Sequence, residues 1–211
     1  MRIVSVNLAQ RRSFTVDGRE VFTGIFKEPA DQPAELTELG FTEDFIADPR
    51  YHGGPDKAVY AYGAQHYDYW RRRYPGLSYG MFGENLTVEG LDEHGVRVGD
   101  RFELNGILLR AVQPRVPCMK LGLKFGSQAF LKMFLEAGRS GIYFAVEGSG
   151  RIAAGDSMTL SQPSGAEVTL AQHFTLWDGR GDPRTLRAIA NCAYVLPKYR
   201  KRALEHLSRT A

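Results

Sequence analysis

The chain has little of what marks membrane, nucleic-acid-binding or disulfide-rich proteins. Its two cysteines, Cys118 and Cys192, cannot build a disulfide framework and are too few for an iron–sulfur cluster. The longest apolar runs span a few residues, far short of the roughly 20 that a membrane-spanning helix needs. A net charge of +3 is too small to argue for nucleic acid as a partner.

What remains is an ordinary globular composition. Hydrophobic residues make up 43% of the 211 and charged residues 24%, which is enough to bury a core. The length fits one large domain, or one domain with a small appendage. The N-terminus enters a strand-like pattern at once, without a basic-then-apolar export signal. We therefore expect a cytoplasmic protein without a membrane partner.

The first 165 residues are dominated by short β-branched or alternating runs between glycines and prolines. Asn105-Gly106 is the strongest hairpin signal, because a type I′ turn needs positive φ at both central residues. We predict a mainly β protein, with a closed antiparallel β-barrel over residues 1–165 and a few inserted helices. The expected strands are Arg2–Asn7, Val21–Phe26, Ala34–Phe41, Ala58–Tyr62, Arg101–Leu104, Ile107–Val112, Ile142–Val146 and Ser157–Leu160.

Helical patterns occur at two places between the expected strands and then along residues 166–211. Residues 166–211 are predicted to form a small appendage of three helices. Proline and aspartate at the expected helix starts, and glycine after expected ends, support these assignments. The expected helices are Ala64–Tyr74, Ser127–Ala137, Thr169–Trp177, Asp182–Ala193 and Pro197–Leu207.

A first candidate for chemistry is Cys118, in the segment Gln-Pro-Arg-Val-Pro-Cys-Met-Lys at residues 113–120. Its two prolines end a strand and leave the cysteine in a stiff, irregular stretch. Arg115 and Lys120 bracket the thiol, and nearby positive charge favours the thiolate. The alternative is that Cys118 is a small buried apolar residue. Cys192, on a predicted helix, is expected to pack in the core.

A second candidate is the segment His-Gly-Gly-Pro-Asp-Lys at residues 52–57. The paired Gly53 and Gly54 allow backbone amides to approach an anion, and His52 and Lys57 add donors or charge. A tight turn between strands is the alternative.

A third candidate is the pair Glu84 and Asn85. It combines an anionic acceptor with an amide and suits the edge of an amino-pyrimidine, although ordinary turn chemistry explains it equally well. The five scattered histidines give a zinc site little support.

Four segments in order resemble the MOSC family, which is named after the C-terminal domain of molybdenum cofactor sulfurases. They are residues 52–57, Gly-Glu-Asn-Leu at 83–86, Val-Gly-Asp at 98–100 and residues 113–118. The match is closest to the YiiM-type branch. Residues 168–207 resemble the three-helix appendage of that branch. The resemblance covers nearly the whole chain, and the order of the four segments is more specific than any one of them.

This resemblance implies a barrel of the pyruvate-kinase type that binds the molybdenum cofactor, molybdenum held by molybdopterin, without pyridoxal phosphate. It implies that Cys118 is the catalytic residue and the molybdenum ligand. Arg115 and Lys57 fit the cofactor phosphate or a metal-oxo group, and Asn85 fits the pterin edge. Tyr62 is either a donor to a bound substrate or a core residue. The cofactor-binding residues implied by motif are His52, Gly53, Gly54, Lys57, Glu84, Asn85 and Arg115.

The resemblance also implies an enzyme that reduces N-hydroxylated compounds, such as hydroxylaminopurine, by oxygen-atom transfer. With no cluster motif, electrons are expected from an external flavoprotein or ferredoxin, and a homodimer is possible. The basic residues from Lys198 to Arg202 either dock an acidic donor or form a solvated helix face. One alternative is a sulfur or cofactor carrier that uses a Cys118 persulfide and has no reductase activity. The other is a non-catalytic binding domain.

Overall fold

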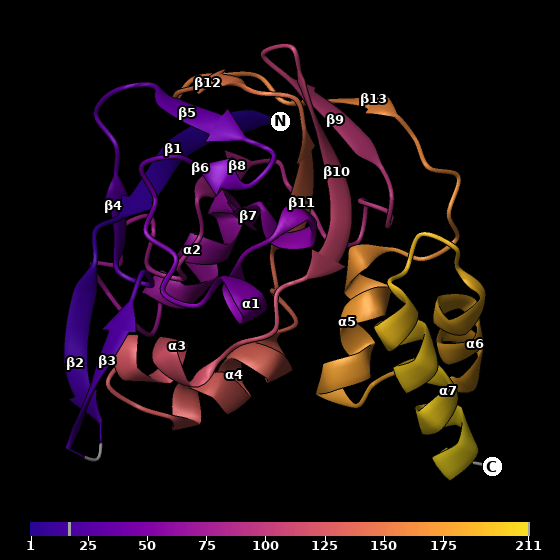
Figure 1. The fold of residues 1–211 in the computed structure, drawn as a ribbon. Helices are drawn as coiled ribbons and strands as arrows, with labels where there is room; N and C mark the ends of the chain where they lie inside the picture. Colours follow the sequence, from indigo (N-terminus) through magenta and orange to yellow (C-terminus); the bar gives the residue numbers. More distant parts are fainter. Residues whose placement is uncertain (17, 211) are drawn as a thin grey trace.

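The structure, a computed structural model, describes residues 1–16 and 18–210, and its centre is an eight-stranded sheet (Figure 1). The strand order is β13-β9-β10-β11-β7-β8-β1-β4. In chain order these strands are β1 (Arg2–Ala9), β4 (Lys27–Pro29), β7 (Val59–Gly63), β8 (Leu86–Glu89), β9 (Arg101–Leu104), β10 (Ile107–Pro114), β11 (Ile142–Glu147) and β13 (Thr159–Gln162). Two smaller sheets join β12 (Gly150–Ile152), β5 (Ala34–Thr37) and β6 (Gly40–Phe41), and β2 (Arg12–Val16) with β3 (Arg19–Thr23).

The predicted closed antiparallel β-barrel is wrong, because the main sheet is open and the fold is mixed α/β. Its edge strand β4 ends at Pro29, which has no N–H to extend a ladder, and the other edge, β13, is exposed along its length. A single bridge between Arg2 and Ser157 joins β1 to the residues before β13 without extending into a ladder. The sheet is also not purely antiparallel: β7 and β8 pair in parallel, joined through helix α2 (Ala64–Arg71).

The predicted Asn-Gly hairpin is confirmed. Strands β9 and β10 pair in register with Leu104 opposite Ile107, which leaves a two-residue turn. Asn105 has a φ of 50° and Gly106 a φ of 81°, the signs that a type I′ turn requires. The chain therefore reaches the long strand β10 in a fixed register, and β10 leads directly to Arg115 and Cys118.

The other helices are α1 (Pro49–His52), the 3-10 turn η1 (Pro55–Lys57), α3 (Met119–Lys124), α4 (Ala129–Ala137), α5 (Leu170–Asp178), α6 (Pro183–Asn191) and α7 (Pro197–Thr210). Helix α4 starts later than predicted, at Ala129, and ends at Gly138, whose φ of 66° stops the helix. Helix α5 opens with a capping box between Thr169 and Gln172. The side chain of Asp182 caps α6.

Two clusters of buried residues hold these elements together. The larger one contains strand residues such as Ile3 and Leu109 together with Leu176 and Ile189 from the C-terminal helices. Helices α5, α6 and α7 therefore pack against the main sheet and against one another (Figure 1). The division at residue 165 into two units stays a prediction. The smaller cluster is aromatic and lies among β7, α2, α3 and α4; its buried members are Tyr60, Tyr62, Tyr67, Trp70, Phe82, Leu121, Phe130 and Phe134.

Candidate functional site

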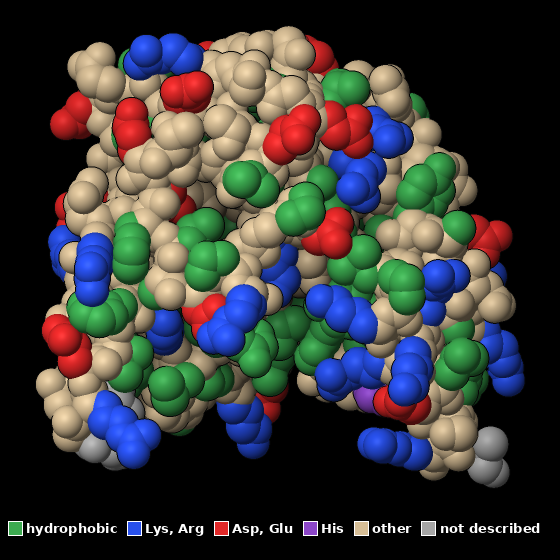
Figure 2. All heavy atoms as spheres, viewed as in Figure 1, with side chains coloured by type: hydrophobic (Ala, Val, Ile, Leu, Met, Phe, Trp, Pro, Cys, Tyr) green, Lys and Arg blue, Asp and Glu red, His purple; other side chains and the backbone are tan. Residues whose placement is uncertain are grey.

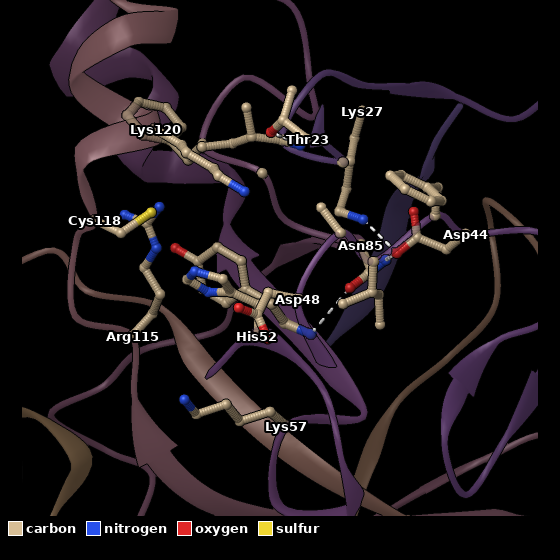
Figure 3. A pocket seen from close by; sticks show the side chains of 18 of the residues that line it. Thr23, Lys27, Asp44, Asp48, His52, Lys57, Asn85, Arg115, Cys118 and Lys120 are labelled. Carbon is tan, nitrogen blue, oxygen red and sulfur yellow. Dashed lines mark hydrogen bonds and ion pairs between the residues drawn. The ribbon is translucent and has the colours of Figure 1, made fainter. Parts of the chain in front are cut away.

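A pocket lies where the end of β10, the α1–η1 segment and the loop before β8 come together (Figure 3). It encloses about 660 Å³, part of which is open to solvent. The lining residues are Thr23, Gly24, Ile25, Lys27, Asp44, Phe45, Ile46, Ala47, Asp48, His52, Lys57, Ala58, Tyr60, Phe82, Gly83, Asn85, Arg115, Cys118, Lys120 and Tyr143.

Five residues singled out from the sequence line this one pocket, although they lie up to 66 positions apart in the chain. They are His52, Lys57, Asn85, Arg115 and Cys118. Figure 3 shows Cys118 and Arg115 together at one end and Asn85 at the other, beside Asp44 and Lys27. One end of the pocket therefore carries a thiol and a guanidinium, and the other carries an amide, a carboxylate and an ammonium group.

Cys118 lies between Pro117 and helix α3, as the N-cap residue of that helix. Burial raises the pKa of its thiol. A hydrogen bond from His52 and the charges of Arg115 and His52 together act more strongly in the opposite direction, and the backbone amide of Leu121 adds to them. The net result is a pKa of about 6, so the thiolate predominates at pH 7. A half-buried thiolate of this kind can bind a soft metal or attack an electrophile.

Arg115 supplies a buried positive charge beside this thiolate. Its side chain is only 4% exposed, and its terminal nitrogen Nη1 has no hydrogen-bond partner. The guanidinium carbon lies 5.6 Å from the ring centroid of Tyr60 and 5.2 Å from that of Phe134. Burial opposes the charge, but Tyr60, Cys118 and other neighbours hold the pKa above its ordinary value. A buried N–H without a partner costs about 1–3 kcal/mol, which an anionic ligand here would recover.

Two lysines add to the positive charge at this end of the pocket. The ammonium group of Lys57 donates to the carbonyl of Tyr51 and lies 5.7 Å from the ring centroid of Tyr143. Burial and the nearby charge of Lys198 lower the pKa of Lys57. Lys120 donates to the carbonyl of Phe22 at 2.9 Å. The Cys118 end is therefore suited to a ligand that carries negative charge.

The opposite end is built on a buried ion pair that no sequence pattern singles out. Lys27 donates to Asp44, and both side chains are nearly inaccessible to solvent. Asn85 Nδ2 donates to Asp44 Oδ2 at 2.9 Å, and the backbone N–H of Ala9 donates to Oδ1 at 2.8 Å. Burial lowers the pKa of Lys27, while Asp44 acts to raise it. This end presents carboxylate, amide and ammonium groups to a ligand.

Three predicted cofactor-binding residues, Glu84, Gly53 and Gly54, do not line the pocket. Glu84 is fully buried, and its carboxylate accepts from Tyr67 Oη, Thr87 Oγ1 and the amides of Gly80 and Phe82. Burial raises its pKa, while these hydrogen bonds act to lower it. Glu84 therefore shapes the loop that carries Phe82 and Gly83 into the pocket.

The two glycines of the His-Gly-Gly segment form the turn between α1 and η1. Gly53 donates its amide to the carbonyl of Pro49 at 3.1 Å, which ends α1. Gly54 has a φ of 86°, a conformation that glycine adopts without steric cost. The turn orients His52 and Lys57, and cofactor binding by its two glycines stays a prediction.

Two further residues have core contacts. The hydroxyl of Tyr62 accepts from Trp70 Nε1 at 2.9 Å within the aromatic cluster, away from the pocket lining. Cys192 is partly buried and packs against the larger core cluster. Both positions match the packing alternatives.

Across residues 1–16 and 18–210, no group of three or more His, Cys, Asp and Glu side chains is arranged to hold a metal ion. Within the same residues, none of the helices has the length and apolar character needed to cross a bilayer. A metal bound at Cys118 would therefore have to bring most of its other ligands with it.

The family model of the MOSC domain matches residues 48–159, which is more than half of the chain and includes every pocket residue from Asp48 to Tyr143. The chain belongs to the MOSC domain family. The predicted resemblance to this family is thereby confirmed, and similarity to YiiM proteins confirms the YiiM-type branch. MOSC domains are associated with binding of the molybdenum cofactor.

Three relatives show how far the likeness extends. The chain is 37% identical over 194 residues to the protein YflK from Bacillus subtilis, covering 90% of this chain and 88% of YflK. The crystal structure of YiiM from Geobacillus stearothermophilus matches with a TM-score of 0.78 and 30% identity, over 98% of both chains. A protein from Gibberella moniliformis named "Reductase" is 33% identical over 176 residues. That match covers 81% of this MOSC chain and only 30% of the longer reductase.

Proposed function

We propose that this MOSC protein binds the molybdenum cofactor in the pocket at Cys118 and reduces N-hydroxylated compounds, such as hydroxylaminopurine, to the corresponding amines. The observation that carries the proposal is the pairing of a thiolate with a buried guanidinium whose Nη1 has no hydrogen-bond partner. A thiolate is a soft ligand of the kind that molybdenum accepts. The Nη1 of Arg115, which has no hydrogen-bond partner, would donate to an anionic ligand.

The residues present fit the two chemically different parts of such a cofactor. Cys118 would bind the metal. Arg115, Lys57 and Lys120 would hold an anionic part of the cofactor, such as its phosphate, by charge-assisted hydrogen bonds. At the other end, Asp44 and Asn85 would offer acceptors and donors to the edge of a heterocycle. The bound cofactor would supply the redox chemistry of oxygen-atom transfer from the N–OH group.

The residues of the chain would prepare this reaction in two ways. His52 and Arg115 keep Cys118 deprotonated at neutral pH, so the metal ligand forms without loss of a proton at binding. The Lys27–Asp44 ion pair fixes the orientation of Asn85, because Asp44 accepts hydrogen bonds from both side chains. Preorganised groups of this kind bind a ligand with little reorganisation.

The relative named "Reductase" supports an oxidoreductase role, since this domain forms part of that longer chain. A carrier that holds sulfur as a persulfide on Cys118 would use the same low thiol pKa. It would use the charge of Arg115 to lower that pKa, but it would not need the unpartnered Nη1 or the carboxylate and amide at the far end of the pocket. The complete pocket therefore favours a cofactor over sulfur alone.

The test is to purify the protein from cells that make molybdenum cofactor and to measure molybdenum, pterin and persulfide. Cys118→Ser is the test variant and Cys192→Ser the matched control, because Cys192 lies outside the pocket. The proposal predicts about one molybdenum and one pterin per chain, lost in Cys118→Ser and retained in Cys192→Ser. The loaded protein should then convert hydroxylaminopurine to adenine with a chemical reductant.

Absence of molybdenum and pterin from well-supplied cells would contradict the proposal. A persulfide on Cys118 without metal would identify the carrier instead. Equal loading of the wild type and Cys118→Ser would mean that the cofactor, if present, is not held by this thiolate.

A further inference from the structure

The start of helix α7 lies beside the mouth of the pocket. Tyr199 Oη donates to Gln113 Oε1 at 2.6 Å, and Gln113 Nε2 donates to the carbonyl of Asp56 at 3.1 Å. Asp56 directly precedes Lys57, which lines the pocket. Lys198, the neighbour of Tyr199, is close enough to Lys57 for their charges to interact. A partner that contacts α7 is thus brought up to the pocket itself.

The positive charge of the chain is concentrated on this side of the molecule. Residues 183–210 hold seven of the 27 Lys and Arg and one of the 24 Asp and Glu, so they carry +6 while residues 1–182 carry −3. Lys198 and Lys201 are both exposed and lie on one face of α7, three positions apart. Figure 2 shows Lys and Arg side chains gathered over α7, beside the notch that separates it from α4.

Two exposed apolar residues directly neighbour residues that line the pocket. The side chain of Tyr51 is 65% exposed and that of Met119 48%. Each is the chain neighbour of a pocket residue, His52 and Cys118. Aromatic residues and methionine are enriched at protein–protein interfaces, where an apolar centre is surrounded by polar and charged groups.

We propose that this surface, defined by Lys198, Lys201, Tyr51 and Met119, docks an acidic electron-transfer protein over the mouth of the pocket. The inference rests on the proposed function, because reduction of the N–O bond consumes two electrons per turnover, which an external reductant has to supply. For each R–NH–OH consumed, two one-electron carriers of the ferredoxin type give up one electron each, and two protons are taken up from the solvent. The products are R–NH₂, water and two oxidised carriers.

Three observations favour a protein of this kind over RNA or a membrane surface. Residues 183–210 carry +6, whereas residues 1–182 carry −3 and would repel a long polyanion. Tyr51 and Met119 directly neighbour pocket residues, while α7 itself exposes Leu204. In the relative from Gibberella moniliformis, this domain is joined to a chain of which it forms only 30%, so the remainder is held close to it covalently.

The test measures binding of an acidic plant-type ferredoxin to the full-length protein at low and high salt. The variants are Lys198→Glu/Lys201→Glu, Tyr51→Ala, and the control Arg72→Glu/Arg73→Glu, which changes the net charge equally at an exposed position after α2. We expect the α7 double variant to weaken binding at least about tenfold, and the control less than about threefold. Tyr51→Ala should weaken binding at both salt concentrations, because its contact is apolar.

Equal losses in the α7 variant and the control would overturn the proposal, since net charge alone would then explain binding. So would an unchanged affinity in both Lys198→Glu/Lys201→Glu and Tyr51→Ala, or tighter binding of a single-stranded RNA or of anionic vesicles than of ferredoxin. Binding is measured without reference to molybdenum, so it separates this surface from the cofactor site. Metal content tests the cofactor proposal, and affinity tests the docking proposal.

Discussion

Replacing His52 by phenylalanine should raise the pKa of the Cys118 thiol. In the structure, a hydrogen bond and the charge of His52 are among the interactions that lower this pKa to about 6, against the opposing effect of burial. Phenylalanine keeps a ring in the same place but can neither donate a hydrogen bond nor carry a charge. Arg115 and the Leu121 amide remain, so part of the lowering should persist.

The size of the effect follows from the strength of a hydrogen bond to a charged group. Such bonds contribute about 1.5–3 kcal/mol, and 1.36 kcal/mol corresponds to one pKa unit, so the pKa should rise by about one to two units. At pH 6 about half of the wild-type thiol is ionised. In the variant the ionised fraction, and with it the rate of attack by Cys118, should be about 5- to 50-fold lower at that pH.

The assay is the rate of iodoacetamide alkylation from about pH 4.5 to about pH 10, in a Cys192→Ser background where Cys118 is the reporting thiol. Because the thiolate reacts, the rate should rise with pH through the thiol pKa and then level off. His94→Phe, at an exposed position, is the matched control and should leave the midpoint unchanged. A wild-type midpoint near that of a free cysteine, or the same midpoint in His52→Phe, would refute the reasoning.

Three further predictions concern stability, each measured by chemical denaturation. His173 is fully buried, neither ring nitrogen has a partner, and burial lowers its pKa from 6.5 to about 3. The unfolded state therefore binds the proton first, and wild-type stability should fall by about 2.5 kcal/mol between pH 7 and pH 4.5 from this group alone. His173→Leu should lack that part of the slope, and parallel slopes would contradict the argument. Glu84→Gln should lower the free energy of unfolding by about 2–4 kcal/mol, because the new amide places N–H donors among the donors that now point at the carboxylate. A loss no larger than that of an ordinary surface substitution would count against this explanation. Asp44→Asn should lower the free energy of unfolding by about 3–5 kcal/mol, because it leaves the buried Lys27 ammonium without its counter-charge. The double variant Lys27→Met/Asp44→Asn should recover part of that loss. No recovery in the double variant would refute the ion-pair explanation.

Local signals predicted local structure well. Asn105-Gly106 predicted a hairpin because its turn depends on two adjacent residues, and the register of β9 and β10 follows from it. Asp182 predicted the start of α6 because its own side chain caps that helix. Closure of the sheet, by contrast, depends on whether distant edge strands meet. Pro29 marks β4 as an edge strand, but nothing in the residues of β13 shows that its ladder stops at β9.

The candidate site shows the same contrast between local sequence signals and contacts between distant segments. Cys118, His52 and Lys57 lie in short segments rich in glycine and proline, and such segments are recognisable from residue order alone. Lys27 and Asp44 are not, because each lies in an ordinary stretch and they become a pair only when β4 and the segment after β6 fold together. Glu84 was predicted to bind a ligand; its carboxylate accepts four hydrogen bonds from neighbouring donors and lies outside the pocket lining, and its role toward a ligand stays a prediction. Sequence patterns find reactive residue types, and the hydrogen-bond network decides which of them remain available.

The charge around Cys118 also indicates the form in which a metal would reach it. A free divalent cation would meet the positive charges of Arg115, Lys57 and Lys120 before it met the thiolate, so its approach would be unfavourable. No further His, Cys, Asp or Glu cluster in the described part of the chain would complete its coordination. A metal inside an anionic, phosphate-bearing complex would meet the opposite situation: the three cations would attract the complex, and Cys118 would offer a ligand to the metal. The charges that disfavour a free metal ion therefore suit a metal carried by an anionic organic cofactor.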